Sequence, residues 1–154
     1  MANELLQYSY LPLFQGRVKN RLVTEYYVQS ILKELGLHKL RTFPLKIRFS
    51  KTITDDAVGL CEGSKKYAVV SIATQCPETG HPLTYLEMMK TLTHELVHAR
   101  QFIRGQLTGI GVWKWKGRNA DNYNYENQPW EKEANRLEET LFSKCFPIYL
   151  TFNQ

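Results

Sequence analysis

The chemically most informative stretch of this sequence is Thr93-His94-Glu95-Leu96-Val97-His98, which places two histidines four positions apart. Side chains at positions i and i+4 of an α-helix lie on one face, so both imidazoles can reach one metal ion. Glu95 follows the first histidine, where its carboxylate can take a proton from a metal-bound water. Zinc suits this chemistry because it lowers the pKa of bound water towards neutrality. The alternative is an ordinary helix with two exposed histidines.

The residues around this stretch predict a helix that begins after Thr84 and ends near Ile103. Thr84 and Glu87 have the spacing of a capping box, and Gly105 suits the left-handed position that follows a helix. One apolar stripe runs along this helix at helical spacing, made of Met88, Met89, Leu92, Leu96, Ala99 and Ile103. The stripe is complete without the two histidines. Packing therefore gives no reason for them, which favours metal binding.

A catalytic zinc site needs a third protein ligand and leaves a fourth position for water. A second helix is predicted from Pro129, because proline suits the first helical position. Glu131, Asn135 and Glu138 follow one another along this helix, beside its buried stripe of Trp130, Ala134, Leu137 and Leu141. A carboxylate that borders the buried stripe can be held rigidly against the first helix, as a metal ligand requires.

Together, His94-Glu95-x-x-His98 and Glu131-x-x-Ala134-Asn135 resemble the gluzincin zinc metallopeptidases, and the short chain is similar to the single-domain minigluzincins. The second run is also similar to that of the ImmA/IrrE group of regulatory metallopeptidases. The resemblance covers residues 45 to 142 loosely and the two site helices most clearly. It implies one zinc ion held by His94, His98 and Glu131, with Glu95 as general base.

The chain departs from the gluzincin pattern at one position. The family often has aspartate where Asn135 stands, and asparagine can accept a hydrogen bond from a ligand imidazole without bringing a charge. Glu133 is a rival third ligand, but it points about 200° around the helix from Glu131 and breaks the family spacing. We therefore expect Asn135 beside the site and Glu131, not Glu133, as the ligand.

These residues predict a zinc-dependent peptidase whose substrate is a peptide or protein. Tyr123 and Tyr125 precede Glu131, and either hydroxyl could donate to the oxyanion of a tetrahedral intermediate, although both could be plain surface tyrosines. They lie in the connection 105–127, which is long enough to cover or gate a site. The strand expected at Tyr67 to Ala73 could pair with an extended substrate at the cleft edge, or it could be internal.

Length and composition predict one domain, residues 1–154, of ordinary globular type, since 43% of the 154 residues are hydrophobic and 23% are charged. The sequence has no apolar run of about 18 residues and no basic start followed by an apolar segment, so we expect neither a membrane span nor a secretory signal. Cys61, Cys76 and Cys145 are odd in number and widely spaced, which is typical of reduced thiols. These features predict a cytoplasmic protein.

The formal net charge of +5 and the pI near 9.1 arise from scattered lysines and arginines, which usually mark solvated faces. In residues 113 to 118, however, tryptophan alternates with lysine and arginine. This segment could contact nucleic acid, or it could be a hairpin whose tryptophans pack on the core. Two alternative functions follow: a basic, DNA-associated SprT-like protease, and a non-catalytic, zinc-stabilised binding module.

The expected fold is therefore α+β, a small zincin-like domain. It comprises an N-terminal helix (Arg17 to Leu35), a three-stranded sheet, the histidine helix and a C-terminal glutamate-bearing helix. The three strands are expected at residues 45–49, 57–61 and 67–73. The apolar segments 5–14 and 146–152 are expected to pack on the domain as an irregular arm and a tail.

Overall fold

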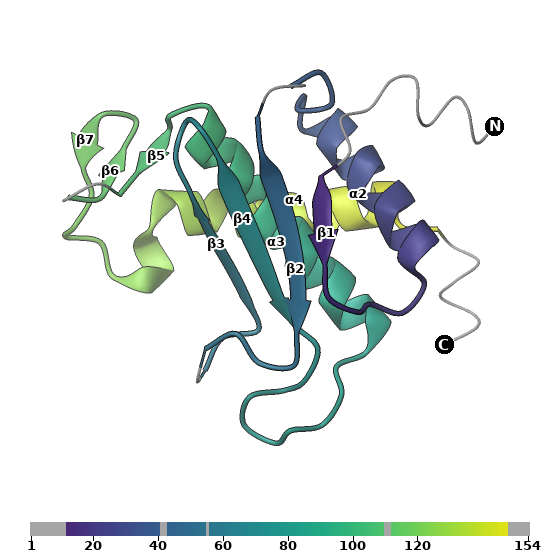
Figure 1. Ribbon diagram of the computed structural model, residues 1–154. Coiled ribbons are helices and arrows are strands. Elements are labelled where there is room, and N and C mark those ends of the chain that lie inside the picture. The colour runs from purple at the N-terminus through teal and green to yellow at the C-terminus, as the bar shows by residue number, and fades with distance from the viewer. Residues whose placement is uncertain (1–11, 41–42, 55, 110–111, 148–154) are drawn as a thin grey trace.

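The computed structural model describes residues 12–40, 43–54, 56–109 and 112–147, and this part of the chain has an α+β fold, as predicted. Its main sheet has the strand order β1-β2-β4-β3. Among the described residues, α3 packs on the sheet through β3 and β4, and α4 packs on α3. α2 contacts both α3 and α4 and lies beside the β1 edge (Figure 1). The bounds are β1 (Leu13–Gln15), α2 (Arg21–Glu34), β2 (Leu45–Ser50), β3 (Gly59–Gly63), β4 (Ala68–Ala73), α3 (Tyr85–Ile103) and α4 (Pro129–Cys145).

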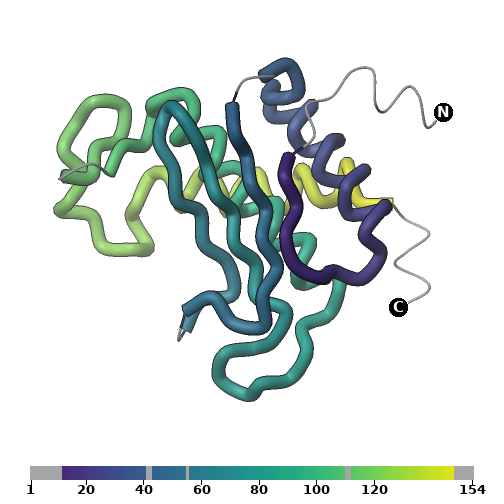
Figure 2. The backbone as a smooth tube through the Cα atoms, viewed as in Figure 1, coloured from purple at the N-terminus to yellow at the C-terminus, as the bar shows by residue number. Residues whose placement is uncertain are grey.

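Alternation along the central strands explains which face of the sheet is buried. In β2, Leu45, Ile47 and Phe49 are buried, and the residues between them are more exposed. Because successive side chains point to opposite faces, this pattern puts the apolar set against the helices. β1, β2 and β4 run parallel, whereas β3 pairs antiparallel to β4. The path of the chain through these strands can be followed in Figure 2.

The prediction of a three-stranded sheet was wrong by one strand. β1 lies in the segment that we expected to be an irregular arm, and it pairs with β2 through Leu13↔Lys46 to Gln15↔Arg48. A strand of three residues is too short to show an alternating pattern, so only its tertiary pairing defines it. Residues 5–11 of the expected arm and 148–152 of the expected tail lie outside the described residues. Phe146, at the start of the tail, is buried.

The sheet order decides between the two interpretations of the predicted strand Tyr67 to Ala73 in favour of an internal strand. β4, which corresponds to the predicted strand Tyr67 to Ala73, pairs with β2 on one side and β3 on the other and is internal. β3 is the edge strand on this side of the sheet, and it contacts α3. An extended ligand can therefore pair with β3 but not with β4 in this part of the chain.

α3 is the central helix and begins and ends as predicted. The Thr84 hydroxyl accepts from the Glu87 amide at 3.1 Å, and the Glu87 carboxylate accepts from the Thr84 amide at 2.8 Å. Gly105 follows the helix with φ 69°. By contrast, α2 begins at Arg21 and not at Arg17, because the chain turns between β1 and α2 with Gly16 and Asn20 in the left-handed region.

The connection between α3 and α4 is not a plain loop. It contains a small antiparallel sheet and a 3-10 helix, namely β5 (Leu107–Thr108), β6 (Lys114–Trp115), β7 (Arg118–Asn119) and η1 (Tyr125–Asn127). The centroids of the Trp113 and Trp115 rings each lie 6.2 Å from that of Trp130 at the start of α4. The segment 113–118 is thus a hairpin. Trp115 packs against the buried cluster that contains Trp130, and Trp113 stacks on the Trp130 ring but is 46% exposed.

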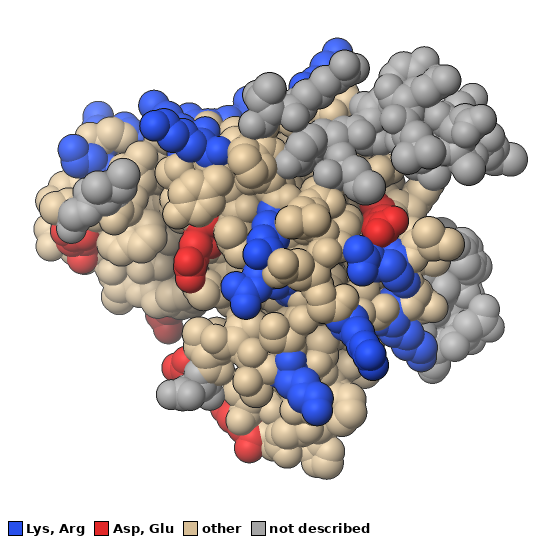
Figure 3. Space-filling view, viewed as in Figure 1, with Lys and Arg blue, Asp and Glu red and all other residues tan. Residues whose placement is uncertain are grey.

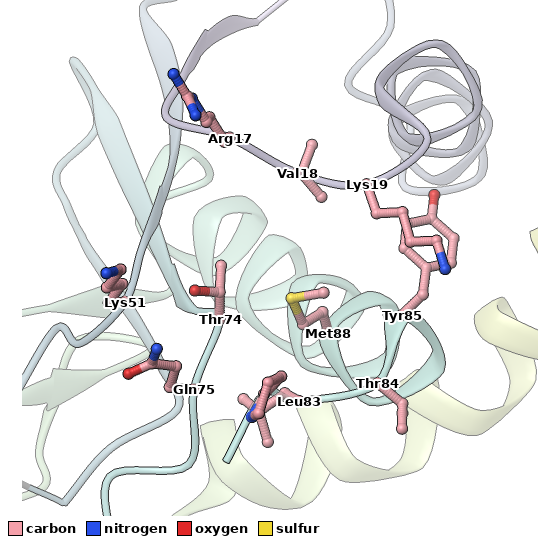
Figure 4. Close-up of a pocket in the computed structure, with 11 residues that line it drawn as sticks. Arg17, Val18, Lys19, Lys51, Thr74, Gln75, Leu83, Thr84, Tyr85 and Met88 are labelled. Atoms are coloured by element: carbon pink, nitrogen blue, oxygen red, sulfur yellow. The ribbon is translucent and has the colours of Figure 1, made fainter. Parts of the chain in front are cut away.

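The surface agrees with the scattered basic residues of the sequence. Lysine and arginine side chains are spread over the sheet-side face among neutral residues and do not merge into one patch (Figure 3). A hollow of about 540 Å³ lies at the start of α3, with Met88 and Val18 in its wall and Lys19 and Lys51 at opposite sides (Figure 4). Among the described residues, no helix is both long and apolar enough to span a membrane.

Candidate metal centre

Contacts between α3 and α4 bring two imidazoles and one carboxylate to a common point. His94 Nε2 lies 3.0 Å from Glu131 Oε2, and His98 Nε2 lies 3.0 Å from Glu131 Oε1. The two Nε2 atoms are 3.2 Å apart. The helices run antiparallel here, since residues later on α3 meet residues earlier on α4. The sequence places the histidines on one helical face, and helix packing supplies the carboxylate.

His98 is oriented by Gln101, a residue that was not predicted from the sequence. Its Nδ1–H donates to Gln101 Oε1 at 2.8 Å. The Gln101 amide nitrogen donates to the Trp130 carbonyl at 3.0 Å and to Glu133 Oε1 at 3.1 Å. Both of these partners are acceptors, so they fix the Gln101 amide nitrogen on their side and turn the amide oxygen towards His98. The oxygen accepts the proton of Nδ1, and the Nε2 atom of His98 therefore keeps a lone pair for a metal. Gln101 is fully buried and links the two site helices.

His94 is oriented by Glu138 and not by Asn135. His94 Nδ1 lies 3.2 Å from Glu138 Oε1, whereas the Asn135 side chain is exposed and makes no hydrogen bond within the described residues. Glu138 is seven positions, or about two helical turns, after Glu131, so the two side chains point in directions that differ by only about 20°. The glutamate side chain is also longer than that of asparagine and can reach His94. The expectation that Asn135 supports the site is therefore corrected to Glu138.

The electrostatics of the cluster favour a cation. Burial lowers the pKa of His94, but hydrogen bonds to Glu131 and Glu138 outweigh burial and raise it to about 10. Burial likewise lowers the pKa of His98, and Glu131 is the main group that turns the net shift upward. Burial raises the pKa of Glu131, yet both histidines hold it well below its usual range. Positive charge is thus stabilised where the donor atoms meet, and a divalent ion supplies such charge.

Glu95 lies between the two histidines in sequence and is 7% exposed. Burial raises the pKa of its carboxyl group, and His98 and His94 oppose that shift. No described residue forms a hydrogen bond to this carboxylate. A buried carboxylate that is not engaged by a neighbour remains available to accept a proton from a bound molecule.

Of the remaining residues that were predicted for the site, one lies beside the candidate metal ligands and two do not contact them. The Tyr125 hydroxyl donates to Glu131 Oε2 at 3.2 Å, so this tyrosine is at the centre, and it is bound to the third carboxylate. Tyr123 is 47% exposed and has no contact with the cluster among the described residues. Glu133 accepts from Gln101 and lies 3.5 Å from Arg100, which makes it a support for Gln101 and not a ligand.

His94, His98 and Glu131 could hold a metal ion. One donor atom from each lies within 4.8 Å of the other two, in a largely buried position. The Nδ1 atom of each imidazole is already paired with a neighbour, so the Nε2 atoms are the ones that face the ion. Two imidazoles and one carboxylate, each held by a further group, are a donor set that transition metals bind well.

No protein-family model matches this sequence, and a search of curated proteins finds no match.

Proposed function

We propose that this protein is a zinc-dependent peptidase of the gluzincin type, with His94, His98 and Glu131 as zinc ligands and Glu95 as general base. The observation that carries the proposal is the meeting of the three donor atoms within 4.8 Å. Two neutral nitrogens and one carboxylate are the ligand set of catalytic zinc sites that keep one position open. A zinc ion there would supply a Lewis acid and lower the pKa of water.

The chain supplies the proton transfers. In this proposal Glu95 takes a proton from the attacking water and gives it to the leaving amine. Its partly desolvated carboxylate has no competing hydrogen bond within the described residues, which suits a group that must gain and lose a proton. A purely structural metal site has no use for such a base, so Glu95 argues against the non-catalytic binding module.

The edge strand supports a peptide as substrate. β3 has no partner strand on its outer side in the described sheet, and it packs against α3 beside Glu95. Free backbone groups of an edge strand can pair with an extended chain. We infer that the substrate backbone runs along β3, which carries its scissile bond past Glu95.

The test is metal analysis and hydrolysis with three proteins: the natural sequence, Glu95→Gln and Glu131→Ala. We expect about one zinc per chain in the first two and loss of zinc in the third, because two histidines alone bind weakly. Hydrolysis of an unfolded peptide library, followed by mass spectrometry, should fall at least about 100-fold in Glu95→Gln.

Retention of stoichiometric zinc by Glu131→Ala would show that the third ligand is misassigned. Full zinc content without cleavage of any library peptide would instead favour the binding module. The library is used because an enzyme of narrow specificity is silent towards a single test substrate.

A further inference from the structure

The first residue of the edge strand lies against the proposed general base. Successive side chains of β3 point to opposite faces, so Gly59, Cys61 and Gly63 share the face that is turned towards α3. Cys61 packs against the core from this face. A Cβ atom at Gly59 would lie 2.8 Å from Glu95 Oε1 and 3.1 Å from Glu95 Cγ, and it would overlap the Thr91 methyl group. The Glu95 carboxylate thus occupies space that a side chain would fill.

Backbone conformation does not explain this glycine. Gly59 is not among the glycines with positive φ, in contrast to Gly105 and Gly117, so other residues can adopt its conformation. Gly63 has a different constraint, since a Cβ there would lie 2.8 Å from the Tyr67 carbonyl oxygen in the turn to β4. What is particular to Gly59 is the close approach of its backbone to two side chains of α3.

The surroundings determine what moves if a side chain is added. The backbone of β3 is held by its ladder with β4, and the Thr91 hydroxyl donates to the Glu87 carbonyl at 3.0 Å. A β-branched side chain in a helix has little rotamer freedom, so Thr91 yields poorly. The Glu95 carboxylate has no hydrogen-bond partner among the described residues and is the least restrained group in the contact.

We propose that Gly59 is a positioning residue for Glu95: the absence of its side chain lets the edge strand lie close to α3 and keeps the Glu95 carboxylate beside the metal centre. The inference rests on the proposed function, because it gives Glu95 a role in proton transfer. It concerns a different part of the site, since the atoms nearest to a Cβ at position 59 belong to Thr91 and Glu95 and not to the three ligand residues. A side chain at position 59 should therefore misplace the base and leave the metal ligands in place.

The experiment compares Gly59→Ala, Thr91→Ala and the double variant. Removing the Thr91 methyl takes away one of the two contacts that an added Cβ would make, and the contact with Glu95 remains. The double variant should regain most of the stability that Gly59→Ala loses, with zinc affinity within about threefold of the natural protein. Its kcat should still be reduced about 100-fold, because a displacement of about 1 Å can cost that much, and KM should change much less. Thr91→Ala alone is the matched control and should keep its kcat.

A double variant with the kcat of Thr91→Ala would overturn the proposal, because the glycine would then serve packing alone. If the natural protein itself cleaves no peptide, the proposed function fails. The placement of Glu95 can still be tested, because crystal structures of the natural protein and of the double variant show it without any activity measurement. A displaced Glu95 carboxylate in the double variant supports the role of Gly59, and an unmoved carboxylate refutes it.

Discussion

Replacement of Gln101 by methionine should weaken metal binding without removing a ligand. Methionine has a similar length and volume, so the packing cost of the change is small, below about 1.5 kcal/mol. It cannot accept the proton of His98 Nδ1, and it cannot donate to the Trp130 carbonyl or to Glu133. The variant therefore removes the hydrogen bonds through which one buried side chain joins α3 to α4.

The expected magnitude follows from the groups that lose a partner. The His98 Nδ1–H is left unpaired in a buried position, which costs about 1–3 kcal/mol. The Trp130 carbonyl lies in the first turn of α4 and still accepts its intrahelical hydrogen bond, so its loss of the Gln101 amide costs little. Glu133 keeps Arg100 at 3.5 Å and is partly exposed, so its loss of the Gln101 amide costs little stability. The metal-free variant should lose about 1–3 kcal/mol of stability. Loss of a group that orients a ligand histidine weakens metal binding about 10- to 100-fold.

The assay is zinc competition against a chromophoric chelator, together with chemical unfolding of the metal-free protein. Asn135→Ala is the matched control, since Asn135 lies one turn after Glu131, but its side chain is exposed and Glu138 is the residue paired with His94. Its zinc affinity should stay within about twofold of the natural protein, because it removes no support of the site. Stability lost in Gln101→Met with unchanged zinc affinity would refute the reasoning, because Gln101 would then only bridge the helices.

Two further predictions concern the other support of the site and the thiols. Glu138→Gln should weaken zinc binding about tenfold in the same competition assay, because the partner of His94 Nδ1 loses its charge, and an unchanged affinity would contradict that role. A disulfide reagent at pH 7 should modify Cys76 first, since hydrogen bonds from the Thr79 hydroxyl and nearby amides lower its pKa. Cys61 should react only on unfolding, because burial raises the pKa of its thiol, and early modification would show that β3 detaches from α3.

Features that depend on neighbours in sequence were predicted well. The capping box at Thr84 and Glu87 and the helix stop at Gly105 were placed at the right residues, because each depends on groups within one helical turn. Proline at the start of α4 was predicted for the same reason. The hairpin at residues 113–118 was one of two open readings, and the packing of its tryptophans on Trp130 favours it.

The support of the two histidines could be predicted only in part. Gln101 lies three positions after His98, so helical spacing alone places it within reach of that imidazole. Its link to α4 has no such signal, because it depends on how the helices pack. Asn135 and Glu138 lie on the same face of α4, and the choice between them depends on the distance to His94. Sequence periodicity reports direction around a helix, and it does not report separation between helices.

By itself, the sequence determined that His94, Glu95 and His98 share one helix and that acidic side chains line a second, since both follow from the helical repeat. Only the tertiary structure decided which carboxylate meets the imidazoles, which strand is the sheet edge and that Gly59 lies against Glu95. These are contacts between segments far apart in the chain. Their geometry is set by packing of the whole core, to which every helix and strand contributes.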